Sequence, residues 1–245
     1  MNPTVLRTNA TAVYRFLSLM SLYLGEGDTL RGKHILDCGA GGPMPPLAIF
    51  AEQGMECFGI DISESQLKRA RAFADRTELA LHLQRADMRN LPFGDASFNY
   101  VYEHYSMCHL NAADTARAIA EMRRVLTPSG LAFLGVISDR CWPLSAYGEE
   151  RNPGEYWMVE GGEETLHCLF SDEASDVLVA DWEVLAKEKA VLHVGGDDAS
   201  KEDWAALHPE APKPCSLDEW MARYERRRND YRYIHTYYVL RKPPQ

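Results

Sequence analysis

The chain has 245 residues, of which 46% are hydrophobic and 25% charged, and its formal net charge is −10. This size and composition are ordinary for a globular α/β protein, so we expect one domain over residues 1–245. The acidic balance disfavours nucleic acid as a partner, and no apolar run is long enough to predict a membrane span. The six cysteines form no close pairs, which predicts reduced thiols in a cytoplasmic protein and gives no zinc-binding spacing.

Strands and helices are predicted to alternate over the first 138 residues. Short apolar runs indicate buried strands, and capped or amphipathic stretches between them indicate helices. This alternation implies a mostly parallel sheet covered on both faces, with a ligand site beyond the carboxyl ends of the strands. After a helix over 10–24, we expect strands over 33–38, 56–60, 79–85, 98–105 and 131–137, and helices over 44–53, 63–76 and 112–126.

The second half of the chain is less regular. Helices are predicted over 171–179 and 217–228, and strands over 182–194 and over 231–240, which is dense in aromatic and β-branched residues. Three further segments are too short to hold cores of their own. They are an N-terminal helical cap over 1–32 and two insertions, over 139–170 and 195–216, which we expect near the substrate site.

The strongest local signal is the loop after the first predicted strand, where residues 35–43 read Ile-Leu-Asp-Cys-Gly-Ala-Gly-Gly-Pro. A dinucleotide site requires G-x-G-x-x-G, but the third glycine of that pattern would fall on Met44. The prolines around Met44 also remove amide donors that a pyrophosphate would use. S-adenosylmethionine (SAM) instead carries an ammonium and a sulfonium, and Asp37 is placed to favour a cation.

Acidic residues also end the next two predicted strands. Asp61 lies twenty residues after Gly41, which is the spacing of an acid that accepts both ribose hydroxyls. Asp87 ends the third strand, where its carboxylate can accept the adenine amino group while the N–H of Met88 reaches a ring nitrogen. The three strand ends together predict one SAM site.

These segments resemble the class I SAM-dependent methyltransferases, in particular the methyltransferase type 11 group. The matching pieces are LDCGAGG, GIDIS, ADMRNLPF, FNYVYEHYSMCHL and VLTPSGLAF, in the expected order over residues 33–137. The resemblance implies a Rossmann-like three-layer α/β sandwich whose seven-stranded, mostly parallel sheet ends in an antiparallel strand, which 231–240 fits. Pro43 departs from the pattern, because many members have a third glycine there.

The resemblance implies methyl transfer from SAM to an O, N or S atom of a small-molecule acceptor, with S-adenosylhomocysteine as the product. Glu103 would offer its backbone to the ammonium, and Tyr14 would close over the cofactor from the first helix. The full set of expected cofactor contacts is Asp37, Gly39, Ala40, Gly41, Asp61, Ile62, Asp87, Met88, Glu103 and Tyr14.

The acceptor side is less determined. If the acceptor must lose a proton, a base helps, and the candidates after the fourth strand are His104 and His109. The expected pocket residues are Tyr105, Trp142, Tyr156 and Trp157.

Other functions stay open at this point. They are a protein or RNA methyltransferase, a SAM-binding protein without catalysis and a nucleotide-dependent oxidoreductase. The segment from Glu103 to Ser106 lacks the N/D-P-P-[YF] signature of base-amine methylation, which disfavours that branch of RNA methylation. Neither the acceptor nor the choice between monomer and homodimer follows from the sequence.

Overall fold

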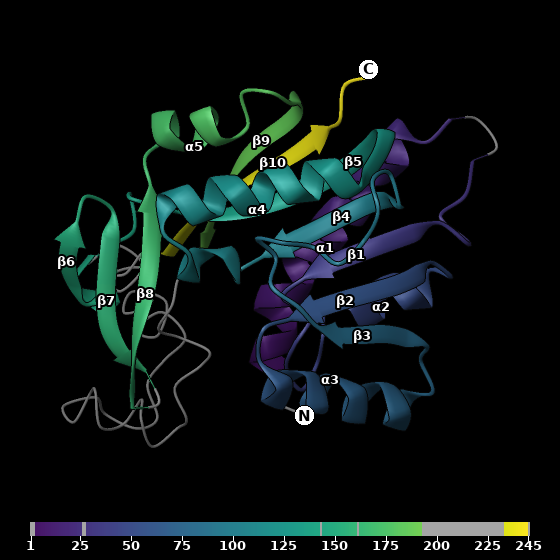
Figure 1. Cartoon of the computed structure of the whole chain (residues 1–245), viewed down its shortest axis with the longest axis horizontal. Helices are drawn as coiled ribbons and strands as arrows, with labels where there is room; N and C mark the ends of the chain where they lie inside the picture. Colours follow the sequence, from purple (N-terminus) through teal and green to yellow (C-terminus); the bar gives the residue numbers. More distant parts are fainter. Residues whose placement is uncertain (1–2, 26–27, 143, 161, 193–232, 245) are drawn as a thin grey trace, which may run out of the picture.

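The computed structural model describes residues 3–25, 28–142, 144–160, 162–192 and 233–244. Within these residues one ten-stranded sheet runs through the molecule, with helices on both faces (Figure 1). Its central row has the order β3-β2-β1-β4-β5-β10-β9. These strands are β1 (His34–Cys38), β2 (Glu56–Asp61), β3 (Leu81–Arg85), β4 (Phe98–His104), β5 (Leu126–Ser138), β9 (Glu183–Leu192) and β10 (Tyr233–Arg241).

The direction of the strands places the candidate site. Strands β1 to β5 pair in parallel, and β10 pairs antiparallel with both β5 and β9. Successive strands are added toward one edge of the sheet from β1 to β3, and toward the other edge from β4 onward. The strand order therefore reverses between β1 and β4. In open α/β sheets, ligands bind at such a reversal, beyond the carboxyl ends of the strands. The predicted Rossmann-like class and the antiparallel last strand are confirmed.

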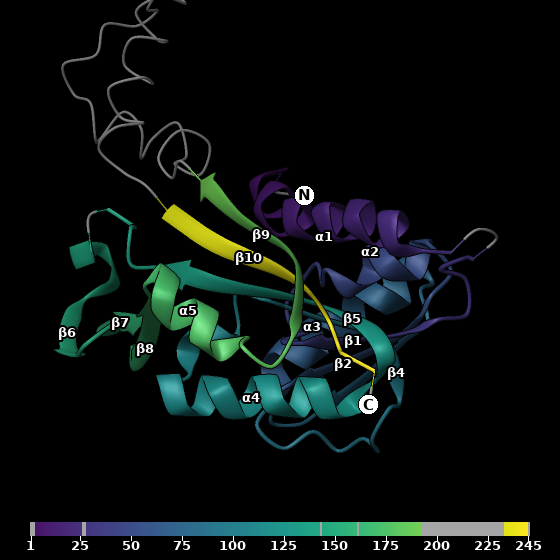
Figure 2. The same cartoon turned by 90° about the horizontal axis from the view of Figure 1, so that it is seen from above.

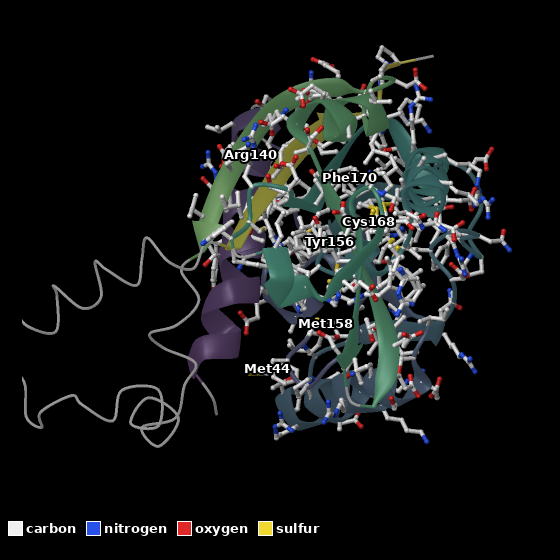
Figure 3. All side chains as sticks on the ribbon, turned by 90° about the vertical axis from the view of Figure 1, so that its left-hand side faces the viewer. Met44, Arg140, Tyr156, Met158, Cys168 and Phe170 are labelled. Carbon is white, nitrogen blue, oxygen red and sulfur yellow. The ribbon has the colours of Figure 1, made fainter. Side chains whose placement is uncertain are left out.

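Three further strands raise the count above the seven that were expected. They are β6 (Glu149–Asn152), β7 (Glu155–Glu160) and β8 (Glu163–Phe170), which form an antiparallel meander that we call the arm. The arm joins the sheet where β8 pairs with β5 at Ile137 and Ser138. Figure 3 looks onto the arm, with residues of β7 and β8 labelled. The sequence analysis predicted an insertion over 139–170 but no strands within it.

The helices form two layers around the sheet. Helices α1 (Pro3–Tyr23) and α2 (Leu47–Glu52) cover one face, and α4 (Ala112–Val125) and α5 (Asp172–Leu178) cover the other, as Figure 2 shows for α1, α2 and α4. Helix α3 (Glu64–Thr77) packs against β2 and β3. Two short 3-10 helices, η1 (Met107–His109) and η2 (Leu144–Tyr147), follow β4 and β5.

Side chains that alternate along the strands pack into the hydrophobic cores on both faces of the sheet. In β1, Ile35 packs toward α1 and α2, whereas Leu36 and Cys38 pack toward α4. Helix α2 begins later than the predicted residue 44 because Pro46 occupies its N-cap, and proline is favoured at a helix start. The predicted helix over 217–228 and insertion over 195–216 lie outside the described residues.

Helix α1 is attached to the sheet by an apolar stripe and by an ion pair. Phe16 is fully buried, and Arg15 donates from Nε to Glu188 of β9 at 2.8 Å. Five cysteines in the described residues are buried and free, as predicted for thiols of this spacing. No helix in the described part of the chain is long and apolar enough to cross a membrane.

Replacing Phe16 with alanine should destabilise the fold by about 3–5 kcal/mol, because the ring packs against Phe50, Tyr102 and Phe133 and its loss leaves a cavity. Chemical denaturation of the purified protein measures this change in unfolding free energy. Leu22→Ala on the same helix is the control, since Leu22 is 71% exposed and its loss should cost less than about 0.5 kcal/mol. Equal effects of the two substitutions would contradict the packing described for α1.

Candidate functional site

The loop after β1 turns back sharply onto β2. Gly39 begins it with φ at +117°, a conformation that side chains rarely adopt. A Cβ atom at Gly39 would overlap Oγ of Ser106, and one at Gly41 would overlap the carboxylate of Asp61. Both positions therefore require glycine in this fold.

The backbone N–H groups of four consecutive loop residues are all used inside the protein. A pyrophosphate needs free amides at this position, so the loop is closed against such an anion. This supports the sequence argument against a dinucleotide. The bonds run from Gly39 and Ala40 to the carbonyl oxygen of Ile60 (2.8 and 2.9 Å), from Gly41 to Oδ2 of Asp61 (3.1 Å) and from Gly42 to the carbonyl oxygen of Gln66 (3.0 Å).

Asp61 connects this loop to the start of α3. Its Oδ2 accepts from the N–H of Gly41, and its Oδ1 accepts from the N–H of Ser63 at 2.7 Å. Ser63, the first residue of the helix predicted over 63–76, is the N-cap of α3 and accepts from the N–H of Gln66 at 3.4 Å. The carboxylate is half-buried, and each oxygen keeps a second lone pair. Its contact with ribose hydroxyls stays a prediction.

Two buried carboxyl groups lie at the ends of β1 and β4. Oε1 of Glu103 accepts from the N–H groups of Ser106 and Met107 at 2.9 and 2.7 Å. Oε2 of Glu103 and Oδ2 of Asp37 have no hydrogen-bond partner among the described residues. Burial raises the pKa of Glu103 to about 7, and burial together with the charge of Glu103 raises the pKa of Asp37 well above its usual value. Such a pair is suited to a cationic ligand.

In the structure, Asp87 is bonded to a neighbouring arginine side chain. The guanidinium of Arg89 donates to both oxygens of Asp87, from Nε at 3.0 Å and from Nη2 to Oδ2 at 2.6 Å, which holds the pKa of Asp87 below its usual value. Arg89 also binds Asp114 in the first turn of α4 at 2.7 Å. The carboxylate is therefore bonded to a neighbouring side chain, and the structure does not test the adenine contact that was predicted for it.

The remaining predicted cofactor contacts differ in exposure. Ile62 follows Asp61 and is 61% exposed, which leaves an apolar side chain open at the carboxyl edge of the sheet. Met88 is half-buried and packs against the core on the α4 side. Tyr14 projects from α1 into solvent. These positions suit Ile62 to contact a ligand, whereas the side chain of Tyr14 lies in solvent.

His104 ends β4 inside a group of aromatic rings. Its Nε2 lies 2.9 Å from Nδ1 of His235 on β10 and 3.3 Å from the hydroxyl of Tyr237. The ring fits because Gly135 of β5 has no side chain, and a Cβ there would lie 2.6 Å from Cδ2 of His104. Burial lowers the pKa of His104 to about 4, so the ring is neutral near pH 7.

His109 lies in a separate cluster with the arm. Its Nδ1 donates to the carbonyl oxygen of Leu166 at 2.9 Å, and its ring meets that of His167 edge-on with centroids 5.0 Å apart. His167 is buried and lies 3.6 Å from the carboxylate of Glu160. The structure thus separates the two candidate bases, one between β4 and β10 and one between η1 and β8.

The predicted pocket residues do not form one wall. Tyr156 is buried, whereas its strand neighbour Trp157 lies beneath the guanidinium of Arg151 at 5.2 Å. Consecutive strand residues point to opposite faces, so these two cannot line the same pocket. Trp142 is 55% exposed. Tyr105 is also exposed and has φ at +75°, a strained value for a non-glycine residue that is frequent at functional sites.

A family model described as a methyltransferase domain matches residues 36–134. An O-methyltransferase of Penicillium expansum is 35% identical over 130 residues, which is 50% of this chain and 46% of that protein. The chloroplastic tocopherol O-methyltransferase of Arabidopsis thaliana is 31% identical over 173 residues, 64% of this chain and 48% of that protein. The chain thus spans less than half the length of these two curated relatives.

A SAM-dependent methyltransferase from Methanosarcina mazei has the same fold, with a TM-score of 0.67 at 18% identity over 93% of this chain and 98% of that one. The methyltransferase domain match runs from β1 into β5. It includes the glycine loop, both buried acids and both candidate bases. It excludes Tyr14, the arm and strand β10.

Several residues around the methyltransferase domain were not predicted from the sequence. His235 and Tyr237 lie in a strand that was predicted, but their contact with His104 joins positions about 130 residues apart. Arg89 was missed although it is only two residues from Asp87, a spacing at which an arginine can fold back onto an acid. Ser106 was missed because only the close approach at Gly39 reveals it.

Gly39→Ala should destabilise the protein more than Gly32→Ala. Both glycines have positive φ, so alanine costs about 1–2 kcal/mol at either position from the backbone alone. At Gly39 the new methyl group also overlaps Ser106, whereas nothing lies within 4 Å of a Cβ at Gly32. Thermal unfolding of both variants measures the difference. Gly39→Ala combined with Ser106→Gly should recover part of the loss, and equal melting temperatures for the two single variants would contradict this account.

Proposed function

We propose that the chain is a SAM-dependent methyltransferase that acts on a small-molecule acceptor. The observation that carries the proposal is the pairing of a loop closed against anions with two buried, incompletely bonded carboxyl groups beside it. The methyltransferase domain match over residues 36–134 supports it independently. The O-methyltransferase relatives favour a small-molecule acceptor over protein or RNA.

The residues at the carboxyl ends of β1 to β4 fit SAM. Asp37 and Glu103 would balance the positive charges of its methionine part, and the loop over 39–41 would lie against it. Asp61 would accept the ribose hydroxyls, and the exposed Ile62 would pack against the adenine. Asp87 would keep its bonds to Arg89, so we assign the adenine edge to the backbone of Met88 rather than to that carboxylate.

When SAM is bound, it supplies a methyl group already activated by the sulfonium. The protein then has to hold the acceptor in line, exclude water and take up a proton where the acceptor carries one. His104 is a neutral imidazole near pH 7 and can take that proton. His109 uses its Nδ1–H to hold the arm, and we assign it a positioning role.

Location and assembly belong to the proposal as well. Free, buried cysteines in the described residues support a reducing compartment, and we propose the cytoplasm. For the assembly, the proposal is a monomer or a homodimer.

Asp61→Ala should weaken SAM binding at least tenfold, which corresponds to about 1.4 kcal/mol or more. The carboxylate both fixes the glycine loop and, in our proposal, accepts the ribose hydroxyls. Isothermal calorimetry with SAM, S-adenosylhomocysteine and NAD measures the affinities. Asp75→Ala, on the exposed side of α3, should bind as the wild type does. Unchanged affinity in Asp61→Ala would reduce Asp61 to a structural link, and binding of NAD without SAM would overturn the proposed function.

SAM affinity should rise between pH 5.5 and 7.5, a range in which the ligand's amino group stays mostly protonated. The pKa of Glu103 is about 7 without ligand, so the carboxyl group is neutral at the lower pH and charged at the upper one, and only the charged form attracts a cation. Glu103→Gln should flatten this rise and weaken binding at pH 7.5. Glu52→Gln, at an exposed position of α2, should leave the profile unchanged. A wild-type affinity independent of pH would contradict the charge role of Glu103.

A further inference from the structure

The two histidines at the ends of β4 and β10 form a hydrogen-bonded pair with two free nitrogen atoms. Nε2 of His104 and Nδ1 of His235 lie 2.9 Å apart, so one proton sits between them. Nδ1 of His104 and Nε2 of His235 are buried and have no partner among the described residues. His235 is 1% exposed. A buried polar atom without a partner is costly, which points to a bonding partner that arrives with a ligand.

Aromatic rings pack around this pair. Tyr105 stacks on His235 with centroids 5.6 Å apart and an interplanar angle of 19°. Tyr233 packs against both Tyr105 and His235, at 5.9 and 4.5 Å, and Tyr147 stacks on Tyr233 at 6.0 Å. Tyr105 is exposed at the same edge of the sheet where β1 and β4 end. Tyr105 is thus the exposed ring of this group, and an exposed aromatic ring favours contact with a planar aromatic ligand.

Resting on the proposed methyltransferase function, we infer that the acceptor is a hydroxyl group of an aromatic molecule, that His104 removes its proton, and that His235 is a positioning residue that fixes the tautomer of His104. In that tautomer the Nε2–H of His104 donates to Nδ1 of His235, which leaves a lone pair on Nδ1 of His104. Tyr237 keeps its hydroxyl near the same Nε2.

The strand order decides which imidazole acts on the acceptor. Strand β4, which carries His104, is the neighbour of β1 and of the glycine loop, whereas β10 lies beyond β5. His104 is therefore nearer to the methyl group, and His235 acts through it.

The proposed methyl transfer requires no reactant or side chain beyond those already named. The acceptor O–H bond breaks and its proton passes to Nδ1 of His104, while the oxygen forms the new bond to the methyl carbon. The S–CH₃ bond breaks with its electron pair retained by sulfur, which leaves S-adenosylhomocysteine. The imidazolium formed at His104 is stabilised by its charge-assisted bond to His235 and later releases the proton to solvent.

The test compares His104→Gln, His235→Leu and His235→Asn in the full-length protein. Simple phenols such as catechol serve as probes that need a base, and thiophenol serves as a matched probe that is already ionised at pH 8. His104→Gln should lower kcat for phenols by about 10²- to 10⁴-fold and leave thiophenol nearly unaffected. His235→Leu should lower kcat for phenols at least tenfold, and His235→Asn, which keeps an acceptor near the Nδ1 position, should restore most of it. SAM affinity should stay within twofold of wild type in all three variants.

Nitrogen-15 NMR of the histidine rings gives a readout that does not require turnover. Wild-type His104 should be neutral at pH 7 with Nε2 protonated, and His235→Leu should increase the other tautomer. A protonated Nδ1 on wild-type His104, or equal loss on phenols and thiophenol, would overturn the inference. A wild-type protein that binds SAM but methylates no phenol would overturn the hydroxyl assignment alone, and one that binds no SAM would overturn the proposed function.

Discussion

The site depends on the hydrogen bonds that fasten the loop after β1 to the end of β2. The amides of Gly39 and Ala40 share the carbonyl oxygen of Ile60, and Asp61 holds Gly41 while also holding the start of α3. Because these bonds use the loop amides, the loop offers no cradle for a phosphate. The same bonds place it beside Asp37, so what remains available to a ligand is negative charge and bare backbone.

The two sides of the β4 end are chemically opposite because of strand geometry. Glu103 and His104 are consecutive, so their side chains leave the strand toward different faces. The carboxylate of Glu103 accepts from the N–H of Met107 in η1 and lies near Asp37 of β1. His104 instead lies over Gly135, next to aromatic rings of β10. One strand end can therefore serve a cationic cofactor with one residue and an acceptor with the next, and a shift of β4 by one residue would exchange them.

The features that could be predicted from the sequence are local ones. The glycine loop and the acids at the strand ends each depend on a few consecutive residues, and the fold class followed from their order. Strand β6 of the arm could not be predicted because all its residues are exposed and polar, which leaves no apolar alternation to detect. Strands β7 and β8 do carry apolar residues, and they were missed. The His104–His235 contact could not be predicted either, since only the antiparallel register of β10 on β5 brings the two rings together. Asp61 and Asp87 both stand at the end of a predicted strand, but the structure shows that the guanidinium of Arg89 binds Asp87.

Burial shifts the two neighbouring residues of β4 in opposite directions, and both shifts favour the neutral form. The pKa of Glu103 rises to about 7 and that of His104 falls to about 4 because each charged form loses its water. Two titratable groups whose pKa values are changed in this way mark separate roles at one site. In the proposed function, a positive ligand beside Glu103 would restore the carboxylate, whereas His104 would stay unprotonated until the acceptor loses its proton. The same burial thus raises the pKa of Glu103 and keeps the imidazole of His104 neutral at pH 7, and a more open site would move both pKa values back toward their usual range.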